Sequence, residues 1–225
     1  MIVQDSWLAT LKQHRAIAVI RAPSLKVGLA MVQAVVLGGF RLVEITWNSD
    51  RPAELVSYLR QSLSQDCQVG AGTLLHSQDM QTAIAAGAQF CFTPHIDRGL
   101  VELAQTASIP MVPGALTPTE IVLAWQSGAS SVKVFPSQAM GGPAYIRNLQ
   151  GPLGHIPLVP TGGVTVENAP AFLAAGAIAV GMSSSLFPKK FIDNHDWLAI
   201  QQRSNRLFQT LKAWTLDPST GARKL

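Results

Sequence analysis

Lys133 is the residue of this sequence with the clearest capacity for chemistry. It stands in Ser-Ser-Val-Lys-Val-Phe-Pro (130–136), a β-branched and aromatic run typical of a buried strand. Burying an ammonium group among apolar side chains is unfavourable and promotes the neutral amine. A neutral amine on a rigid strand is a nucleophile that can form a Schiff base with a ketone. The alternative is a lysine at a strand end, whose stem covers apolar surface while its charged head reaches water.

Glu44 is a second charged residue in hydrophobic surroundings, within Leu-Val-Glu-Ile-Thr (42–46). A buried carboxyl without a partner has a raised pKa, which suits a general acid or base near neutral pH. An ion pair with Lys133 would instead explain why both residues are buried. The two interpretations are compatible, because a Schiff-base lysine needs a nearby proton carrier.

Two turns of small residues could bind an anion: Thr-Gly-Gly-Val (161–164) and Gly-Met-Ser-Ser-Ser (181–185). Such turns leave backbone N–H groups free to approach a phosphate. The five histidines have none of the spacings typical of a metal site. A serine-hydrolase elbow and a Walker loop are also absent from the sequence. We therefore expect a site for a small anionic substrate, with neither metal nor cofactor.

The elements that position these residues follow a repeated layout of helix, glycine and apolar strand. Gly39, Gly87, Gly128 and Gly176 each stand where a helix should end, since glycine tolerates the left-handed conformation. The intervals between them exceed one βα unit of about 30 residues, so each should hold two. The eight expected strands are Ala16–Arg21, Arg41–Thr46, Cys67–Thr73, Gln89–Thr93, Pro110–Ala115, Ser130–Pro136, Ile156–Thr161 and Ile178–Gly181.

Eight such units predict an α/β protein that forms a single (β/α)₈ TIM barrel. An open doubly wound sheet is the structural alternative. We expect residues 1–225 to form one barrel domain, with residues 1–14 as an extra N-terminal helix at the bottom of the barrel. Residues 196–214 should form the last helix, and residues 217–225 a loose tail. In such barrels the reactive groups lie at the carboxyl ends of the strands, and a phosphate site often follows strands seven and eight.

Composition excludes several classes of function. The 17 Lys and Arg residues outnumber the 13 Asp and Glu residues, but they are scattered, so we expect no nucleic-acid partner. A mild positive charge suits an anionic small molecule. Every apolar stretch is interrupted well before the length of a membrane span, and the N-terminus lacks the pattern of a signal peptide. Cys67 and Cys91 should be small buried residues in a reducing cytosol, so we expect a cytoplasmic protein.

At these positions the chain resembles a known family, the 2-keto-3-deoxy-6-phosphogluconate (KDPG) and 4-hydroxy-2-oxoglutarate (KHG) aldolases. The matching motifs run in order over most of the chain: Val-Glu-Ile-Thr (43–46), Val-Gly-Ala-Gly-Thr (69–73), Phe-Thr-Pro-His (92–95), Val-Pro-Gly-Ala (112–115), Val-Lys-Val-Phe-Pro (132–136) and Val-Pro-Thr-Gly-Gly-Val (159–164). Members are class I aldolases that need no metal and are commonly homotrimers. The resemblance therefore implies a homotrimer without a cofactor.

The resemblance also implies a role for each matching residue. Lys133 would be the Schiff-base lysine and Glu44 the general acid and base. Substrate binding would fall to Thr73 at the pyruvyl carboxylate, to Pro94 and Phe135 as lining, and to Thr161, Gly162, Gly163, Gly181 and Ser183 at the phosphate end. Some members carry an arginine four residues after the catalytic glutamate, where this chain has Asn48. Others lack it and have an arginine at the end of the first strand, like Ile-Arg-Ala (20–22) here, so the resemblance implies that Arg21 binds the substrate carboxylate or phosphate.

The implied reaction is cleavage of KDPG to pyruvate and glyceraldehyde 3-phosphate, with KHG cleavage to pyruvate and glyoxylate as a further activity. The Asn48-Ser49 pair also resembles that of the 6-phospho-2-keto-3-deoxygalactonate aldolases, whose substrate differs at C4. Two other classes stay open. A phosphate-binding barrel isomerase or epimerase would use Glu44 as a base and Lys133 as a fixed charge, and a sugar-phosphate binder would have no catalytic role.

Overall fold

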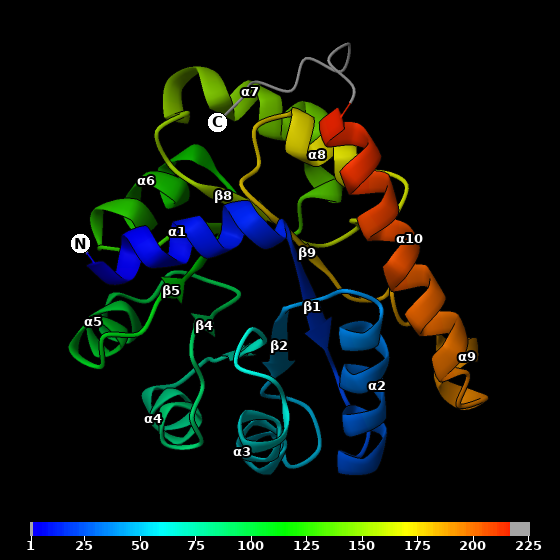
Figure 1. The fold of residues 1–225 in the computed structure, drawn as a ribbon. Coiled ribbons are helices and arrows are strands. Elements are labelled where there is room, and N and C mark those ends of the chain that lie inside the picture. Colours follow the sequence, from blue (N-terminus) through cyan, green and yellow to red (C-terminus); the bar gives the residue numbers. More distant parts are fainter. Residues whose placement is uncertain (1, 217–225) are drawn as a thin grey trace.

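The computed structural model describes residues 2–216, in which parallel strands alternate with helices. The strands are β1 (Ala16–Ile20), β2 (Leu42–Thr46), β3 (Gln68–Gly72), β4 (Cys91–Phe92), β5 (Met111–Val112), β6 (Gly114–Ala115), β7 (Val132–Val134), β8 (Leu158–Pro160) and β9 (Val180–Met182). The helices are α1 (Ile2–His14), α2 (Leu25–Leu37), α3 (Pro52–Ser62), α4 (Ser77–Ala85), α5 (Arg98–Thr106), α6 (Pro118–Gln126), η1 (Gln138–Met140), α7 (Pro143–Leu153), α8 (Ala169–Ala174), α9 (Lys189–Asp193) and α10 (Trp197–Leu216). Figure 1 shows the longer helices ranged around the outside of the strands, with α1 lying across them.

The strands do not form the single closed (β/α)₈ barrel that the sequence predicts. Six of them form an open, curled parallel sheet in the order β5-β4-β3-β2-β1-β9, and three form a small sheet in the order β6-β7-β8. The fifth expected strand, 110–115, is divided at Pro113, which has no N–H to donate to a ladder. Between β8 and β9, an isolated bridge joins Thr161 to Gly181. The prediction of a single closed barrel was wrong because a count of apolar strands does not show whether each strand is hydrogen-bonded to the next.

The ends of the helices agree with the glycine pattern. Gly39, Gly87, Gly128 and Gly176 have φ angles of 111°, 96°, 93° and 104°, in the region that favours glycine. The predicted N-terminal and last helices are confirmed as α1 and α10. The tail expected at 217–225 lies outside the described residues, and the assignment of the whole chain to one domain stays a prediction.

An inner core fills the amino-terminal end of the strands and is covered by α1. Its centre is Trp7, whose ring lies 5.0 Å from that of Phe90 and whose indole N–H donates to Ser131 Oγ at 3.1 Å. Leu11 and Phe92 are buried in the same cluster. The larger core packs the outer helices against the other side of the strands. Helix α1 therefore anchors the amino-terminal end of the strands. Glu44 and Lys133 lie on two of these strands, so this packing supports their positions.

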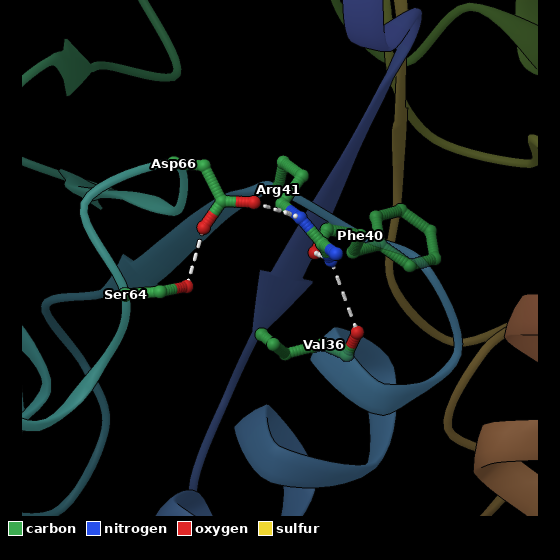
Figure 2. Close-up of polar contacts among 5 residues, drawn as sticks. All are labelled: Val36, Phe40, Arg41, Ser64 and Asp66. Atoms are coloured by element: carbon green, nitrogen blue, oxygen red, sulfur yellow. Dashed lines mark hydrogen bonds and ion pairs between the residues drawn. The ribbon is translucent and has the colours of Figure 1, made fainter.

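A polar cluster of Arg41, Ser64 and Asp66 ties the loops before β2 and β3 together (Figure 2). Arg41 Nε donates to Asp66 Oδ2 at 2.7 Å, and its Nη1 donates to the carbonyl oxygens of Val36 and Phe40 at 3.2 and 2.9 Å. Ser64 Oγ donates to the other carboxylate oxygen of Asp66. Every charged group of this cluster therefore has a partner.

Cys67 and Cys91 are buried and form no disulfide. Burial raises the pKa of Cys67 to about 11 and that of Cys91 to about 12, so both thiols stay protonated and unreactive near neutral pH. Within residues 2–216, no helix has the length and apolar character needed to cross a membrane.

Candidate active site

Lys133 lies in the middle of β7 and is only 5% exposed. Its backbone is held between β6 and β8, paired with Gly114 and Val159, and its N–H donates to the carbonyl of Pro113 at 2.9 Å. Its Nζ stands over two aromatic rings, 5.9 Å from the centroid of Phe92 and 5.0 Å from that of Phe135. Since Phe92 belongs to the inner core, the amine lies directly above that core. The buried-strand interpretation of Lys133 is thus confirmed, and the surface-lysine alternative is wrong.

Glu44 lies in the middle of β2 and is 1% exposed, and its Oε1 has no hydrogen-bond partner among residues 2–216. Burial raises the pKa of this carboxyl above its ordinary value of 4.5, while the positive charges of Lys133 and Arg21 act in the opposite direction. A carboxylate oxygen enclosed by protein yet bonded to nothing is unusual, because buried polar atoms are nearly always paired. Glu44 is therefore a buried carboxyl with an unused hydrogen-bond acceptor among the described residues.

Gly72 of β3 makes room for the Glu44 side chain. A Cβ at this position would lie 1.8 Å from Glu44 Oε1 and 2.4 Å from its Cδ, well inside contact distance. The strands β2 and β3 are in register, with Glu44 opposite Gly70 and Thr46 opposite Gly72. The sequence analysis gave no role to Gly72, although its place in Val-Gly-Ala-Gly-Thr is the signal that could have found it.

Glu44 and Lys133 are not joined by a close ion pair, since no N–O contact within 4.0 Å links them. Their charges still interact, as the effect of Lys133 on the Glu44 pKa shows. The simple ion-pair explanation of their burial is therefore wrong. The two groups are therefore buried, electrostatically linked and not in direct contact.

Arg21 is exposed just after β1, and its charge reaches Glu44. The next residue, Ala22, donates its N–H to Ser49 Oγ at 2.9 Å, and Ser49 Oγ also lies 3.2 Å from Thr46 Oγ1. These bonds connect the ends of β1 and β2. The sequence singled out Ser49 only as part of the Asn48-Ser49 pair, and its bond to residue 22 was not predicted because only the fold brings the two together. Asn48 is exposed and has no recorded bond to the described residues.

Thr73 follows β3 and has a φ of 57°, a left-handed conformation that is strained for a β-branched residue. Strain of this kind is concentrated at functional sites. Pro94, the next predicted lining residue, packs closely on Gly114, where a Cβ would lie 2.3 Å from the Pro94 carbonyl carbon. Phe135 is 39% exposed, so one face of its ring is open while the other faces Lys133 Nζ. The contacts of Phe135 and Gly114 place these lining residues next to Lys133.

The turns 161–164 and 181–185 lie side by side, because the bridge between Thr161 and Gly181 joins their first residues. We call this pair the two-turn site. Gly162 and Gly163 have φ angles of 86° and 80°, which other residues rarely adopt. Gly162 also approaches the Phe135 ring, where a Cβ would lie at 3.2 Å. The two-turn site is thus adjacent to the lysine.

The peptide groups of the two-turn site turn their carbonyls into the protein. Gly162 O accepts from Ser137 Oγ at 3.1 Å, Gly163 O from Asn168 Nδ2 at 3.0 Å, and Ser183 O from the N–H of Leu186 at 2.8 Å. Within the described residues, the N–H groups of Gly162, Gly163 and Ser184 donate to no protein acceptor. Free N–H groups with the carbonyls turned away form the arrangement that binds anions.

Within residues 2–216, no three or more His, Cys, Asp and Glu side chains lie together so that they could hold a metal ion. His95, the histidine nearest to a strand end in the sequence motifs, is exposed, and its backbone carbonyl accepts from Thr93 Oγ1 at 2.6 Å.

Comparison with known proteins identifies the family to which this chain belongs. An aldolase family model matches residues 8–203, nearly all of the described chain. Its description is KDPG and KHG aldolase, and the chain belongs to this family of lyases.

Individual relatives agree with this assignment. The 2-dehydro-3-deoxy-phosphogluconate aldolase of Dickeya dadantii (strain 3937) is 32% identical over 181 residues, covering 80% of this chain and 84% of the relative. The 2-dehydro-3-deoxy-6-phosphogalactonate aldolase of Escherichia coli (strain K12) is 33% identical over 172 residues, covering 76% and 83%. A crystal structure of the KDPG aldolase from Legionella pneumophila, with pyruvate captured as a covalent carbinolamine, has a TM-score of 0.81 and 27% identity, covering 89% of this chain and 97% of that one.

Proposed function

We propose that this chain is a class I aldolase that cleaves KDPG to pyruvate and glyceraldehyde 3-phosphate through a Schiff base on Lys133. The observation that carries the proposal is the enclosed, unpartnered Glu44 Oε1 near a buried lysine amine. An aldol cleavage needs these two groups, one to form the imine and one to move a proton.

The reaction begins when Lys133 Nζ attacks the C2 ketone and forms a carbinolamine, which loses water to give an iminium. Glu44 then takes the proton of the C4 hydroxyl, directly or through one water. The C3–C4 bond breaks and its electron pair moves into an enamine, while the aldehyde departs. Glu44 returns the proton to C3, and water hydrolyses the iminium to pyruvate and the free amine.

The remaining residues bind the two ends of the substrate. Thr73 and Arg21 hold the carboxylate of the pyruvyl half, and Pro94 and Phe135 line the space around the amine. The phosphate is bound by Thr161, Gly162, Gly163, Gly181 and Ser183. Support for this part comes from the free N–H groups and the turned-away carbonyls of the two-turn site.

The galactonate-derived epimer is a second candidate substrate. The Asn48-Ser49 pair and the 33% identity to an aldolase named for that substrate favour it. Cleavage of KHG to pyruvate and glyoxylate is a third, unphosphorylated option. We further propose a homotrimer in the cytoplasm, a location that suits two buried free thiols.

Borohydride reduction in the presence of pyruvate tests the covalent step. Mass spectrometry should find a pyruvyl adduct on Lys133 and none on the exposed Lys189, which serves as an internal control. The absence of an adduct, or an adduct on another lysine, would remove the Schiff-base mechanism. An isomerase that uses Lys133 only as a charge would give this negative result.

Pyruvate release identifies the substrate. A coupled lactate dehydrogenase assay should be run on KDPG, its C4 epimer and KHG, and kcat/KM compared. We expect KDPG to give the highest value. A higher value for the epimer would assign the chain to the galactonate branch without changing the mechanism.

A further inference from the structure

Arg203 of α10 is a charged residue beside the two-turn site that the proposed reaction does not use. It is half-buried, and its guanidinium Nε donates to the carbonyl oxygen of Ser185, the last residue of the 181–185 turn. Arg203 thus holds a carbonyl of the second turn by a hydrogen bond. Ser137 and Asn168 hold Gly162 O and Gly163 O of the first turn in the same way. Arg203 is the charged member of this set of donors.

Arg203 also acts on the segment that follows the first turn. Its positive charge helps to lower the pKa of Glu167, although the backbone N–H of Glu167 and the Thr165 hydroxyl are the larger causes. Thr165 and Asn168 cap each other, with Thr165 N donating to Asn168 Oδ1 at 2.7 Å and Asn168 N to Thr165 Oγ1 at 3.2 Å. The guanidinium of Arg203 is therefore bonded to the 181–185 turn, and its charge acts on the segment directly after the 161–164 turn.

The Ser185 hydroxyl adds a second observation. Its Oγ is enclosed by protein and has no hydrogen-bond partner in the part of the chain that the structure describes, although the Ser185 carbonyl is held by Arg203. A buried hydroxyl without a partner is unfavourable unless something else completes it. Within the described residues, Ser185 thus combines a carbonyl held by Arg203 with an unpaired hydroxyl.

We propose that Arg203 is a positioning residue for the phosphate of the substrate and sets the preference for phosphorylated over unphosphorylated 2-keto acids. The inference rests on the proposed function. Arg203 holds the 181–185 turn against the 161–164 turn, so that the free N–H groups of both converge on one phosphate. A substrate without a phosphate makes no use of this arrangement.

Steady-state kinetics of Arg203→Gln with two substrates tests the proposal. We expect the KM for KDPG to rise about tenfold, since a charge-assisted hydrogen bond is lost, with kcat within about twofold of the wild type. The kcat/KM for KHG, which has no phosphate, should stay within about twofold of the wild type. Inhibition by inorganic phosphate should weaken in parallel with the KM for KDPG.

Arg206→Gln is the matched control. Arg206 lies on the same helix, is exposed, also acts on the charge of Glu167, and makes no side-chain hydrogen bond within the described residues. It should leave both substrates unchanged. An equal loss for KDPG and KHG in Arg203→Gln, no loss for either, or the same split in Arg206→Gln would overturn the proposal.

Melting temperatures are measured for each variant, and if Arg203→Gln does not fold, Arg203→Lys is measured with the same expected split. Failure of the proposed function is distinguishable, because it would appear in the wild type as a lack of pyruvate release or of borohydride trapping.

Discussion

Arg41 and Glu44 are three residues apart, one just before β2 and one inside it, and their surroundings differ completely. Arg41, just before β2, has three recorded acceptors in Asp66 and the carbonyls of Val36 and Phe40 (Figure 2). Glu44, inside the strand, has an oxygen with no partner. The polar groups of the Arg41 cluster at the amino ends of the strands are therefore paired, which stabilises the fold. Above the inner core, one carboxylate oxygen of Glu44 is unpaired among the described residues.

The pKa directions of the two carboxyls express the same contrast. Hydrogen bonds from Ser64 and Arg41 hold the pKa of Asp66 below its ordinary value, which favours the folded protein above that value. Burial raises the pKa of Glu44, so its ionised form weakens the folded state. Glu44 is thus a buried carboxyl whose ionised form is unfavourable, and it is the group to which the proposed mechanism assigns proton transfer.

Replacing Lys133 should have the largest effect on activity. We expect Lys133→Met to lower kcat/KM by about 10⁴-fold or more, because no imine can form. Its melting temperature should match or exceed that of the wild type, since an apolar residue replaces a buried charge. Pyruvate release and thermal unfolding measure the two quantities. A stable variant with substantial activity would show that Lys133 is not needed for cleavage. The contrast between a stabilising Arg41 cluster and a catalytic region around Glu44 and Lys133 would then be wrong.

Glu44→Gln should lower kcat for KDPG by about 10²- to 10³-fold, the usual contribution of a general acid or base. It should still form the borohydride adduct with pyruvate, because Lys133 is intact. Single-turnover trapping and steady-state assays separate these steps. A variant that retains full kcat would show that Glu44 carries no proton in the cycle.

Gly72→Ala tests the space that Glu44 needs. The new Cβ would collide with Glu44 Oε1, so the carboxyl must move, and we expect kcat to fall about tenfold or more. Overpacking should also lower the free energy of unfolding by about 1–3 kcal/mol. Gly151→Ala is the control, because a Cβ there meets nothing within 4 Å. Equal behaviour of the two variants would contradict the packing argument.

The raised pKa of Glu44 predicts two pH effects of opposite sign. Because the base must be ionised, kcat should fall as the pH drops below this raised value. The folded state binds the extra proton between 4.5 and the raised pKa, so the free energy of unfolding should decrease as the pH rises through this window. Urea denaturation at several pH values should show this slope in the wild type and not in Glu44→Gln.

Arg41→Gln should have the smallest effect. It removes an ion pair whose Asp66 partner is well exposed, together with two hydrogen bonds to carbonyls. We expect the melting temperature to fall by about 2–4 °C and kcat to stay within about twofold of the wild type. A large loss of kcat would show that the amino ends of the strands also control the site.

The burial of Lys133 and Glu44 could be predicted from local patterns. A lysine or glutamate among β-branched residues is recognisable wherever the strand lies, because an unpaired buried charge is unfavourable and therefore rare. Glycines after helices are equally recognisable, and all four at the helix ends adopt the expected conformation. These features depend on residue type and near neighbours alone.

The closure of the fold and the supporting contacts could not be predicted in this way. Pro113 divides one strand and the β8–β9 junction carries an isolated bridge, so the strands form two sheets. Ser49 meets Ala22 across 27 positions, and Arg203 meets Ser185 across 18. No periodicity links such residues.

The sequence by itself determined that this protein buries a lysine and a glutamate on separate strands and carries two glycine turns suited to an anion. The tertiary structure decided that the two charges do not pair, that one Glu44 oxygen stays unbonded over Gly72, and that an arginine on the last described helix fixes one turn. The reason is physical: burial and backbone preference act on each residue locally. Which polar groups meet depends on how distant segments pack.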